Sequence, residues 1–235
     1  MSAQGPKVAV ITGASQGIGA GLVAAYRKLG YAVVANSRTM PAPQDLDVLA
    51  VQGDIADPDV AERVVNAGAE RFGRVDTLVN NAGIFLSKPF TDYTEKDFAL
   101  LIGVNLAAFF RVTQRVIPHM LQQGGGHIVN ITTSLVDHAK SSVPSVLASL
   151  TKGGLQSATK SLAIEYAGRG IRSNAVSPGT IRTPMHAADT LYEGLPPVGR
   201  IGEVSDIVDA VIYLETAPFV TGAILHVDGG ESAGH

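Results

Sequence analysis

Lys7-Val8-Ala9-Val10-Ile11 runs directly into Thr12-Gly13-Ala14-Ser15-Gln16-Gly17-Ile18-Gly19, and this junction decides how the chain folds. A buried strand that enters a helix through a glycine turn is typical of nucleotide-binding folds. Gly13 can turn the chain with positive φ, Gly17 lets the backbone approach a diphosphate, and Gly19 lets the helix pack tightly. The helix would then offer free N–H groups and its positive dipole end to the anion. The spacing differs from the common G-x-G-x-x-G pattern, so a plain tight turn is the alternative.

Apolar runs and helical patterns alternate along the whole chain. Further strands are predicted at 32–35, 48–51, 77–79, 128–131, 173–176 and 224–227, and helices at 18–29, 57–72, 94–122, 144–167 and 205–215. Met40-Pro41-Ala42-Pro43 stands where a second crossover helix would lie, and its prolines predict a short extended connection instead. The alternation predicts an α/β fold, with one doubly wound, mostly parallel sheet and helices on both faces. We expect a single domain over residues 1–235.

The composition excludes several classes of function. The chain has 235 residues and a net charge of −3, which is neither basic nor acidic enough to indicate nucleic acid or a membrane surface as partner. It has no cysteine, which excludes disulfides, thiolate metal sites and thiol catalysis. The first residues have no signal-peptide pattern, and the most apolar window, Phe98–Phe110, is short for a bilayer span. We therefore expect a soluble, cytoplasmic protein.

Further motifs follow the glycine turn in a fixed order. They are Asn80-Asn81-Ala82-Gly83, Val104-Asn105-Leu106, Thr151-Lys152-Gly153, Ser177-Pro178-Gly179-Thr180-Ile181-Arg182-Thr183, Val220-Thr221-Gly222 and Val227-Asp228-Gly229-Gly230. Together they resemble the classical short-chain dehydrogenase/reductase family over nearly the full length. The resemblance implies a Rossmann-type sheet of seven strands, a nicotinamide cofactor, a small-molecule substrate and a homodimer or homotetramer.

The resemblance also carries the cofactor contacts over, position by position. The pyrophosphate turn corresponds to Gly13, Ser15, Gln16, Gly17, Ile18 and Gly19. Asp54 and Ile55 correspond to the pair beside the adenine, and the adenine ribose is lined by Asn81, Ala82 and Gly83. The segment that binds the carboxamide and fixes the nicotinamide face corresponds to Pro178, Gly179, Ile181 and Thr183.

The end of the second strand, Ala35-Asn36-Ser37-Arg38, indicates the type of cofactor. A carboxylate there would accept both hydroxyls of the adenine ribose and repel a 2′-phosphate. The chain instead has Ser37, a hydroxyl donor, and Arg38, which can bind a phosphate in a bidentate, charge-assisted way. This pair favours NADP(H) over NAD(H). The alternative is that Arg38 is a solvated surface arginine.

The catalytic positions depart from the family. Asn105 and Lys152 match the family's Asn and Lys, and the serine position falls on Thr133. The tyrosine expected four residues before the lysine is replaced by Ala148, and no tyrosine occurs between Tyr93 and Tyr166. A hydride that arrives at a carbonyl carbon generates a basic alkoxide, so the usual proton donor is missing. Hydride positioning depends on the cofactor site and is not affected.

Three interpretations of Ala148 remain open. In the first, the protein is an NADP(H)-dependent oxidoreductase whose proton comes from water relayed by Lys152 and Thr133, from a group such as His138, or from the substrate. An iminium or activated C=C substrate would suit such a site. In the second, the protein is a non-catalytic NADP(H)-binding sensor or partner subunit. In the third, it is an engineered tyrosine-to-alanine knockout of a carbonyl reductase.

Other polar residues do not form a recognisable site. The six histidines show no metal-ligand spacing, so we predict no metal. Ser134, Asp137 and His138 lie within one short stretch, whereas a hydrolytic triad requires convergence in space. A substrate loop is expected over about 184–200. A mostly apolar pocket is suggested by Met185, His186, Leu191, Tyr192, Phe85, Leu86 and Val143.

Overall fold

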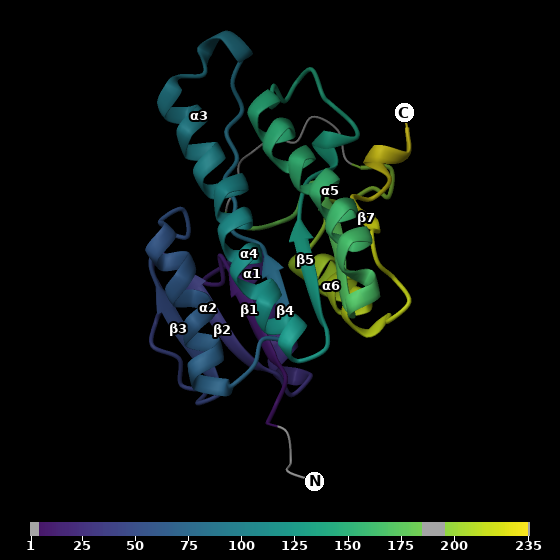
Figure 1. The fold of residues 1–235 in the computed structure, drawn as a ribbon. Coiled ribbons are helices and arrows are strands. Elements are labelled where there is room, and N and C mark those ends of the chain that lie inside the picture. Colours follow the sequence, from purple (N-terminus) through teal and green to yellow (C-terminus); the bar gives the residue numbers. More distant parts are fainter. Residues whose placement is uncertain (1–4, 185–195, 235) are drawn as a thin grey trace.

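Seven parallel strands form one sheet in the order β3-β2-β1-β4-β5-β6-β7 (Figure 1). The computed structural model describes residues 5–184 and 196–234. The strands are β1 Val8–Thr12, β2 Ala32–Ser37, β3 Val48–Gln52, β4 Thr77–Asn80, β5 Gly126–Ile131, β6 Ile171–Pro178 and β7 Ile224–Val227. The order changes direction at β1, and ligands of such sheets bind at the carboxyl ends of the strands beside this switch point. The predicted doubly wound α/β fold is confirmed.

Helices cover both faces of the sheet. They are α1 Gly17–Lys28, α2 Pro58–Phe72, α3 Glu95–Leu101, α4 Ala108–Gln122, α5 Val146–Tyr166 and α6 Val204–Thr216. In Figure 1, α2, α4 and α5 lie on the near face of the sheet, and α1 and α6 lie behind it. Successive residues of β1 enter different cores: Val10 packs with the α2 and α4 side, and Ile11 with the α1 and α6 side. Burial on both faces explains why the strands are apolar throughout.

The connection from β2 to β3 has no helix, as the two prolines predicted. Arg27 at the end of α1 holds this connection, because its guanidinium pairs with Asp45 at 2.7 Å and with Asp47 at 2.9 Å. The missing crossover helix leaves the end of β2, with Ser37 and Arg38, beside an extended segment.

The helical pattern predicted over 94–122 forms one continuous run with an irregular middle. Thr94 caps its start, and Asp97 completes the capping box. Residues Ile102–Ala107, between α3 and α4, form a π-helical segment that contains Asn105. The run Glu95–Gln122 has 28 residues and is long and apolar enough to cross a membrane, which Phe98–Phe110 alone is not. This is weak evidence for a span, because core helices meet the same criterion, and Val112, Val116 and Met120 of α4 lie in the core.

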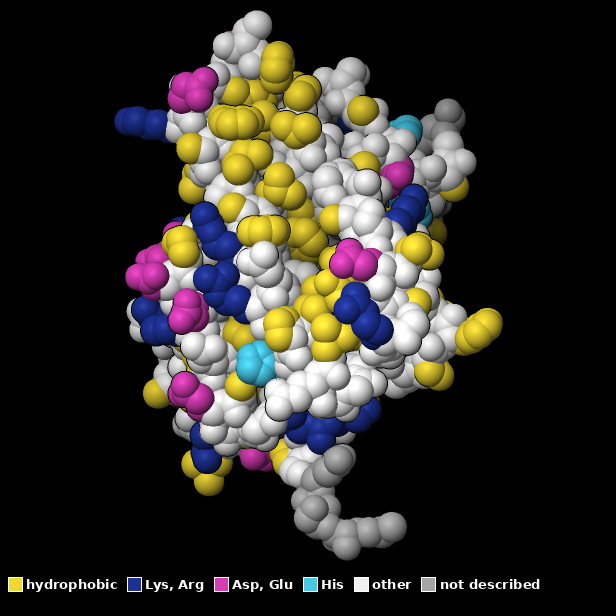
Figure 2. All heavy atoms as spheres, viewed as in Figure 1, with side chains coloured by type: hydrophobic (Ala, Val, Ile, Leu, Met, Phe, Trp, Pro, Cys, Tyr) yellow, Lys and Arg dark blue, Asp and Glu magenta, His cyan; other side chains and the backbone are white. Residues whose placement is uncertain are grey.

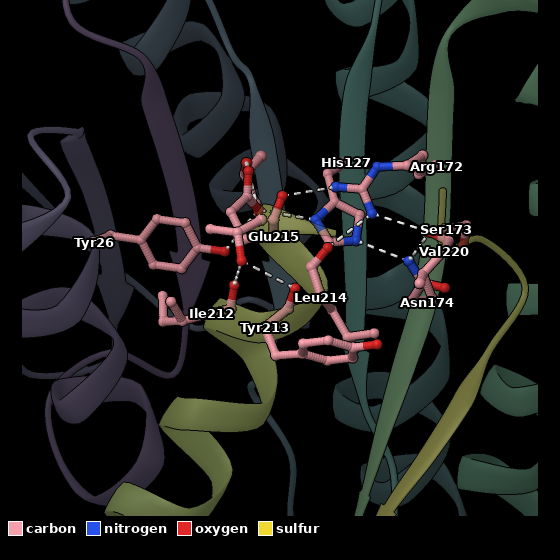
Figure 3. A network of polar contacts seen from close by, with 12 residues as sticks. Tyr26, His127, Arg172, Ser173, Asn174, Ile212, Tyr213, Leu214, Glu215 and Val220 are labelled. Atoms are coloured by element: carbon pink, nitrogen blue, oxygen red, sulfur yellow. Dashed lines mark hydrogen bonds and ion pairs between the residues drawn. The ribbon is translucent and has the colours of Figure 1, made fainter. Parts of the chain in front are cut away.

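A buried polar network lies at the opposite end of the sheet from the glycine turn (Figure 3). The Glu215 carboxylate, near the end of α6, accepts hydrogen bonds from Tyr26, Tyr31 and Thr77 at 3.0–3.1 Å. It also meets Nδ1 of His127 at 2.9 Å. Residues far apart in sequence are therefore tied to one carboxylate where β4, β5 and α6 meet.

Candidate active site

The glycine turn after β1 has the geometry that a phosphate cradle requires. Gly13 has a φ of +66° and Gly17 a φ of +54°, a region that disfavours residues with a Cβ. A Cβ on Gly19 would lie 2.1 Å from the carbonyl oxygen of Gly13, so only glycine lets α1 begin so close to the turn. Gln16 is the N-cap residue, but its side chain does not cap α1. The N-cap side chain therefore accepts no hydrogen bond from the first N–H groups of α1.

A hydroxyl that sequence reasoning missed holds this turn against β4. The Oγ1 of Thr12 accepts hydrogen bonds from the backbone N–H groups of Asn81 and Ala82 at 3.1 and 3.0 Å. The Asn81 amide donates to the carbonyls of Thr12 and Gly13 at 2.9 and 3.0 Å. The side chain of Asn81 therefore positions the turn. The sequence feature that could have indicated this role is a threonine at the last position of the first strand.

The end of β2 lies beside the same turn. The hydroxyls of Ser15 and Ser37 are 2.8 Å apart, which joins the turn to β2. Arg38 follows Ser37 and is exposed. An open cavity of about 380 Å³ adjoins this point and is lined by Ser15, Gln16, Thr39, Met40, Pro41 and Gln52. Two hydroxyls at an open cavity, with an exposed arginine next in the sequence, suit a phosphorylated ribose chemically.

Two further predicted segments lie at the same edge of the sheet. After β3, the Asp54 carboxylate accepts from the backbone N–H of Ala56 at 3.0 Å, and Ile55 is buried. After β6, the bare Cα of Gly179 lies against Asp228, because an added Cβ would be 2.8 Å from the Asp228 Cα. Thr183 reaches the glycine turn, since its side chain would be 3.4 Å from a Cβ on Gly17. The structure thus brings the segments after β1, β3 and β6 to one edge.

Lys152 and Asn105 meet beside Gly83. Lys152 on α5 donates from Nζ to the carbonyl oxygen of Ile131 at 2.8 Å. A Cβ on Gly83 would lie 2.9 Å from this Nζ and 3.4 Å from Oδ1 of Asn105. Because Gly83 has no side chain, the amine of Lys152 can pack directly against its backbone. Burial lowers the pKa of Lys152 to about 8.

Asn105 acts as a bridge between the loop after β4 and α5. Its Oδ1 accepts from the N–H of Ile84 at 2.9 Å, and its Nδ2 donates to the carbonyl of Ile84 at 3.0 Å and to Oγ1 of Thr151 at 3.2 Å. The π-helical segment inserts an extra residue into the turn, which sets the direction of this side chain. Thr151, which precedes the lysine, is a second residue that sequence reasoning missed.

Thr133 and Ala148 are the remaining positions of the predicted catalytic set. Thr133 follows β5, and its Oγ1 accepts from the N–H of Leu135 at a long 3.4 Å. Ala148 lies on α5 one turn before Lys152 and is buried. Phe85, Leu86 and Val143 are half-buried. The predicted pocket residues Met185, His186, Leu191 and Tyr192, and most of the predicted substrate loop, lie outside the described residues.

The C-terminal turn supports the Thr133 segment, which the sequence did not indicate. Glu231 is buried, and its carboxylate meets Lys140 Nζ at 3.1 Å and accepts from Ser134 Oγ at 3.3 Å. Asp137 accepts from His226 on β7 and from Gln156 on α5. The segment between β5 and α5 is thus tied to the end of the chain.

The doubly wound fold and the glycine turn after β1 define a dinucleotide-binding α/β protein with a lysine at the carboxyl edge of its sheet. The sequence matches the family model described as enoyl-(acyl carrier protein) reductase over residues 13–232. The chain belongs to the short-chain dehydrogenase/reductase family, which confirms the resemblance. A 3-oxoacyl-[acyl-carrier-protein] reductase of Thermotoga maritima is 34% identical, over 95% of this chain and 97% of the relative.

Solved structures agree with this assignment. The 3-ketoacyl-(acyl-carrier-protein) reductase of Brucella melitensis, complexed with NADH, has a TM-score of 0.90 at 31% identity and covers 98% of this chain and 100% of its own. A blue fluorescent protein from a metagenomic library, in complex with NADPH, has a TM-score of 0.88 at 33% identity, over 97% and 98% of the two chains. The chain thus belongs to a family of oxidoreductases. Of these two structural neighbours, one is complexed with NADH and the other with NADPH.

Proposed function

We propose that this protein binds NADP(H) in preference to NAD(H) and transfers hydride to or from a small carbonyl, alcohol or imine-like substrate. The observation that carries this proposal is that Lys152 and Asn105 are buried and both approach Gly83 closely, in the loop after β4. Burying an ammonium that has only a carbonyl oxygen as partner costs free energy, and a role in catalysis would account for this cost.

The residues at the strand ends would hold the cofactor. Gly13, Gly17 and Gly19 would receive the diphosphate, and Ser37 and Arg38 the phosphorylated ribose. Lys152 would bond the nicotinamide ribose, and the segment with Gly179 and Thr183 would fix the nicotinamide face. The cofactor supplies the hydride when it is bound. A proton must then come from a group other than tyrosine.

This proton would come from water relayed by Lys152 and Thr133, from a group such as His138, or from the substrate. The Lys152 ammonium has a pKa of about 8, so it can lose a proton near neutral pH. The Thr133 hydroxyl can pass a proton on through water, and His138 follows on the same segment. An iminium substrate needs no donor, because hydride addition gives a neutral amine directly.

A second candidate function is that of a non-catalytic NADP(H)-binding sensor or partner subunit. Ala148 is the observation that favours it, since a general acid contributes roughly 10²–10⁴-fold to a rate. In this case cofactor binding would be intact and turnover absent.

Binding and turnover measured side by side test both candidates. The chain has no tryptophan, so nicotinamide emission can be followed without energy transfer from indole. We expect NADPH emission to change on binding, and NADPH to be consumed with a reactive diketone or a cyclic imine. Lys152→Met should abolish turnover. Binding without turnover on any carbonyl, activated alkene or imine would favour the sensor, and no binding would contradict both functions.

A further inference from the structure

Glu231, in the short turn Glu231–Ala233 after β7, places a buried carboxylate against the segment between β5 and α5. The carboxylate accepts a hydrogen bond from Ser134 Oγ at 3.3 Å and pairs with Lys140 Nζ at 3.1 Å. These two partners stand at the start and at the end of the stretch 134–140. One carboxylate near the end of the chain therefore holds both ends of this stretch.

The two partners differ in how they would respond to loss of the carboxylate. The Lys140 side chain is 30% exposed, so its ammonium can bind water instead. Ser134 is 3% exposed, so its hydroxyl would stay buried after losing this acceptor, which is unfavourable. The effect of removing the Glu231 carboxylate should therefore fall on Ser134, the residue that directly follows Thr133.

The Thr133 hydroxyl takes its place from the backbone of the same segment. Thr133 is the N-cap residue of the short 3-10 turn Ser134–Val136, and its Oγ1 accepts from the N–H of Leu135. Because this contact lies within the segment, the hydroxyl moves wherever the segment moves. Proton transfer tolerates little displacement, since an error of about 1 Å can reduce a rate by about 10²-fold.

The turn that carries Glu231 is itself held in place. The Asp228 carboxylate accepts from the N–H of Ser232 at 2.9 Å. An added Cβ would lie 2.8 Å from the Asp228 Cα on Gly179, and 2.8 Å from the Pro196 Cβ on Gly229. The end of the chain thus packs against the segment after β6 and the described end of the predicted substrate loop, at the carboxyl edge of the sheet (Figure 1).

We propose that Glu231 is a positioning residue for the Thr133 hydroxyl and acts through Ser134. The carboxylate holds Ser134, and Ser134 fixes the backbone on which Thr133 stands. Glu231 itself transfers no proton. The proposal rests on the proposed oxidoreductase function, in which the Thr133 hydroxyl relays a proton through water.

Steady-state reduction of a reactive diketone by NADPH tests the effect on turnover. Glu231→Ala should lower kcat by between about ten-fold and about 10²-fold, with the Kd of NADPH unchanged. Glu231→Gln should recover most of this loss, because its amide oxygen can still accept from Ser134. Glu165→Ala, at an exposed position near the end of α5, is the control and should keep the native kcat. A native kcat in Glu231→Ala would overturn the proposal.

A second substitution separates positioning from a general structural role. Thr133→Val keeps the branched shape of the side chain and removes the hydroxyl. In this background Glu231→Ala should have no further effect on kcat, because the group that Glu231 positions is absent. A further fall as large as the one in the native background would show that Glu231 acts independently of Thr133, against the proposal.

The methyl group of Thr133 provides a measurement that needs no turnover. In protein with isotope-labelled threonine methyls, the Thr133 resonance should shift or broaden in Glu231→Ala. The methyl resonance of Thr77, in the polar network at the opposite end of the sheet, should be unchanged. An unaltered Thr133 resonance would refute the positioning role even if kcat fell. A native protein without turnover would contradict the proposed function, whereas the Thr133 resonance would still decide whether Glu231 positions this residue.

Discussion

At position 148 a methyl group stands where the family resemblance predicts a phenol, on the helix face that carries Lys152. The Lys152 ammonium would lower the pKa of a phenol placed there, as a nearby positive charge does for any acid. Thr133 would lie near the same phenol. The catalytic framework would then regain its missing acid through one substitution.

Ala148→Tyr should therefore change activity in a direction that separates the proposed functions. If only the acid is missing, turnover of simple ketones or diketones should rise by up to ~10²–10⁴-fold. If the native substrate uses the space beside Ala148, native turnover should fall with NADPH binding unchanged. A folded, NADPH-binding variant with unaltered activity on all substrates would leave the non-catalytic function ahead. NADPH consumption and emission titrations measure both quantities.

Arg38 should decide the cofactor preference. We expect NADPH to bind at least ten-fold tighter than NADH, about 1.4 kcal/mol, because the guanidinium pairs with the 2′-phosphate. Arg38→Ala should remove most of this difference, and Arg71→Ala, an exposed arginine on α2, should leave it unchanged. Equal affinities of the native protein for NADPH and NADH, measured by titration calorimetry, would disprove the assignment.

At the scale of elements, His127 on β5 contacts Glu215 on α6 and Asn174 on β6 (Figure 3). The Asn174 amide has a fixed orientation, since its Nδ2 donates to Val220 and its Oδ1 accepts from the N–H of Ala223. Its Nδ2 also faces Nε2 of His127 at 3.1 Å, so Nε2 must accept and Nδ1–H must donate to Glu215. Protonation of Nε2 would place two donors against each other.

Burial lowers the pKa of His127 below its usual 6.5 in the folded protein, and Glu215 only partly opposes this shift. For Glu215, burial by itself would raise the pKa, but hydrogen bonds from His127, Tyr31 and Tyr26 outweigh it and bring the pKa to about 2. Tyr26, Tyr31 and Arg172 also face this cluster. Below pH 6.5 His127 binds a proton in the unfolded chain but not in the folded chain. The free energy of unfolding therefore falls as pH decreases. A second loss begins below pH 4.5, where unfolded Glu215 becomes protonated.

We expect the free energy of unfolding in urea to fall between pH 6.5 and 5, with a contribution from His127 of up to about 1.4 kcal/mol per pH unit. His127→Asn cannot titrate and should flatten this slope, whatever its effect on absolute stability. His119→Asn, on α4 and outside the network, should keep the native slope. Identical pH slopes for the native protein and His127→Asn would contradict the assignment of a neutral, buried histidine.

At the scale of the whole molecule, one face carries exposed hydrophobic side chains in addition to the two buried cores. Figure 2 shows hydrophobic side chains gathered over α3 and along the seam between α4 and α5. On α5, Leu147 and Leu155 are buried, whereas Leu150 is 57% exposed and Ile164 is 84% exposed. Phe98 and Leu100 on α3, Phe110 on α4 and Val146 on α5 are also exposed. Such a face is typical of an interface between subunits.

We expect this face to form a dimer or a tetramer of closed symmetry. Light scattering at micromolar concentration should give at least twice the monomer mass. Leu150→Glu should shift the population toward monomer, since it places a charge within the apolar face. Leu46→Glu, at an 86% exposed position in the β2–β3 connection, should leave the mass unchanged. A native monomer under these conditions would count against assembly.

The sequence by itself determined the sheet and the glycine turn, because these depend on local patterns. The absence of the family's tyrosine stays a prediction from the same patterns. A buried parallel strand must be apolar throughout, and a turn with positive φ at Gly13 and Gly17 must use glycine, so both are visible along the chain. Only the tertiary structure decided which side chains meet. Tyr26 and Glu215 are in contact although they are 189 residues apart, and Thr12 at the end of β1 contacts Asn81 after the neighbouring strand β4. The segment Ile102–Ala107 is π-helical where Asn105 bridges Ile84 and Thr151. Such contacts arise from the packing of distant elements, and no pattern along the chain encodes them.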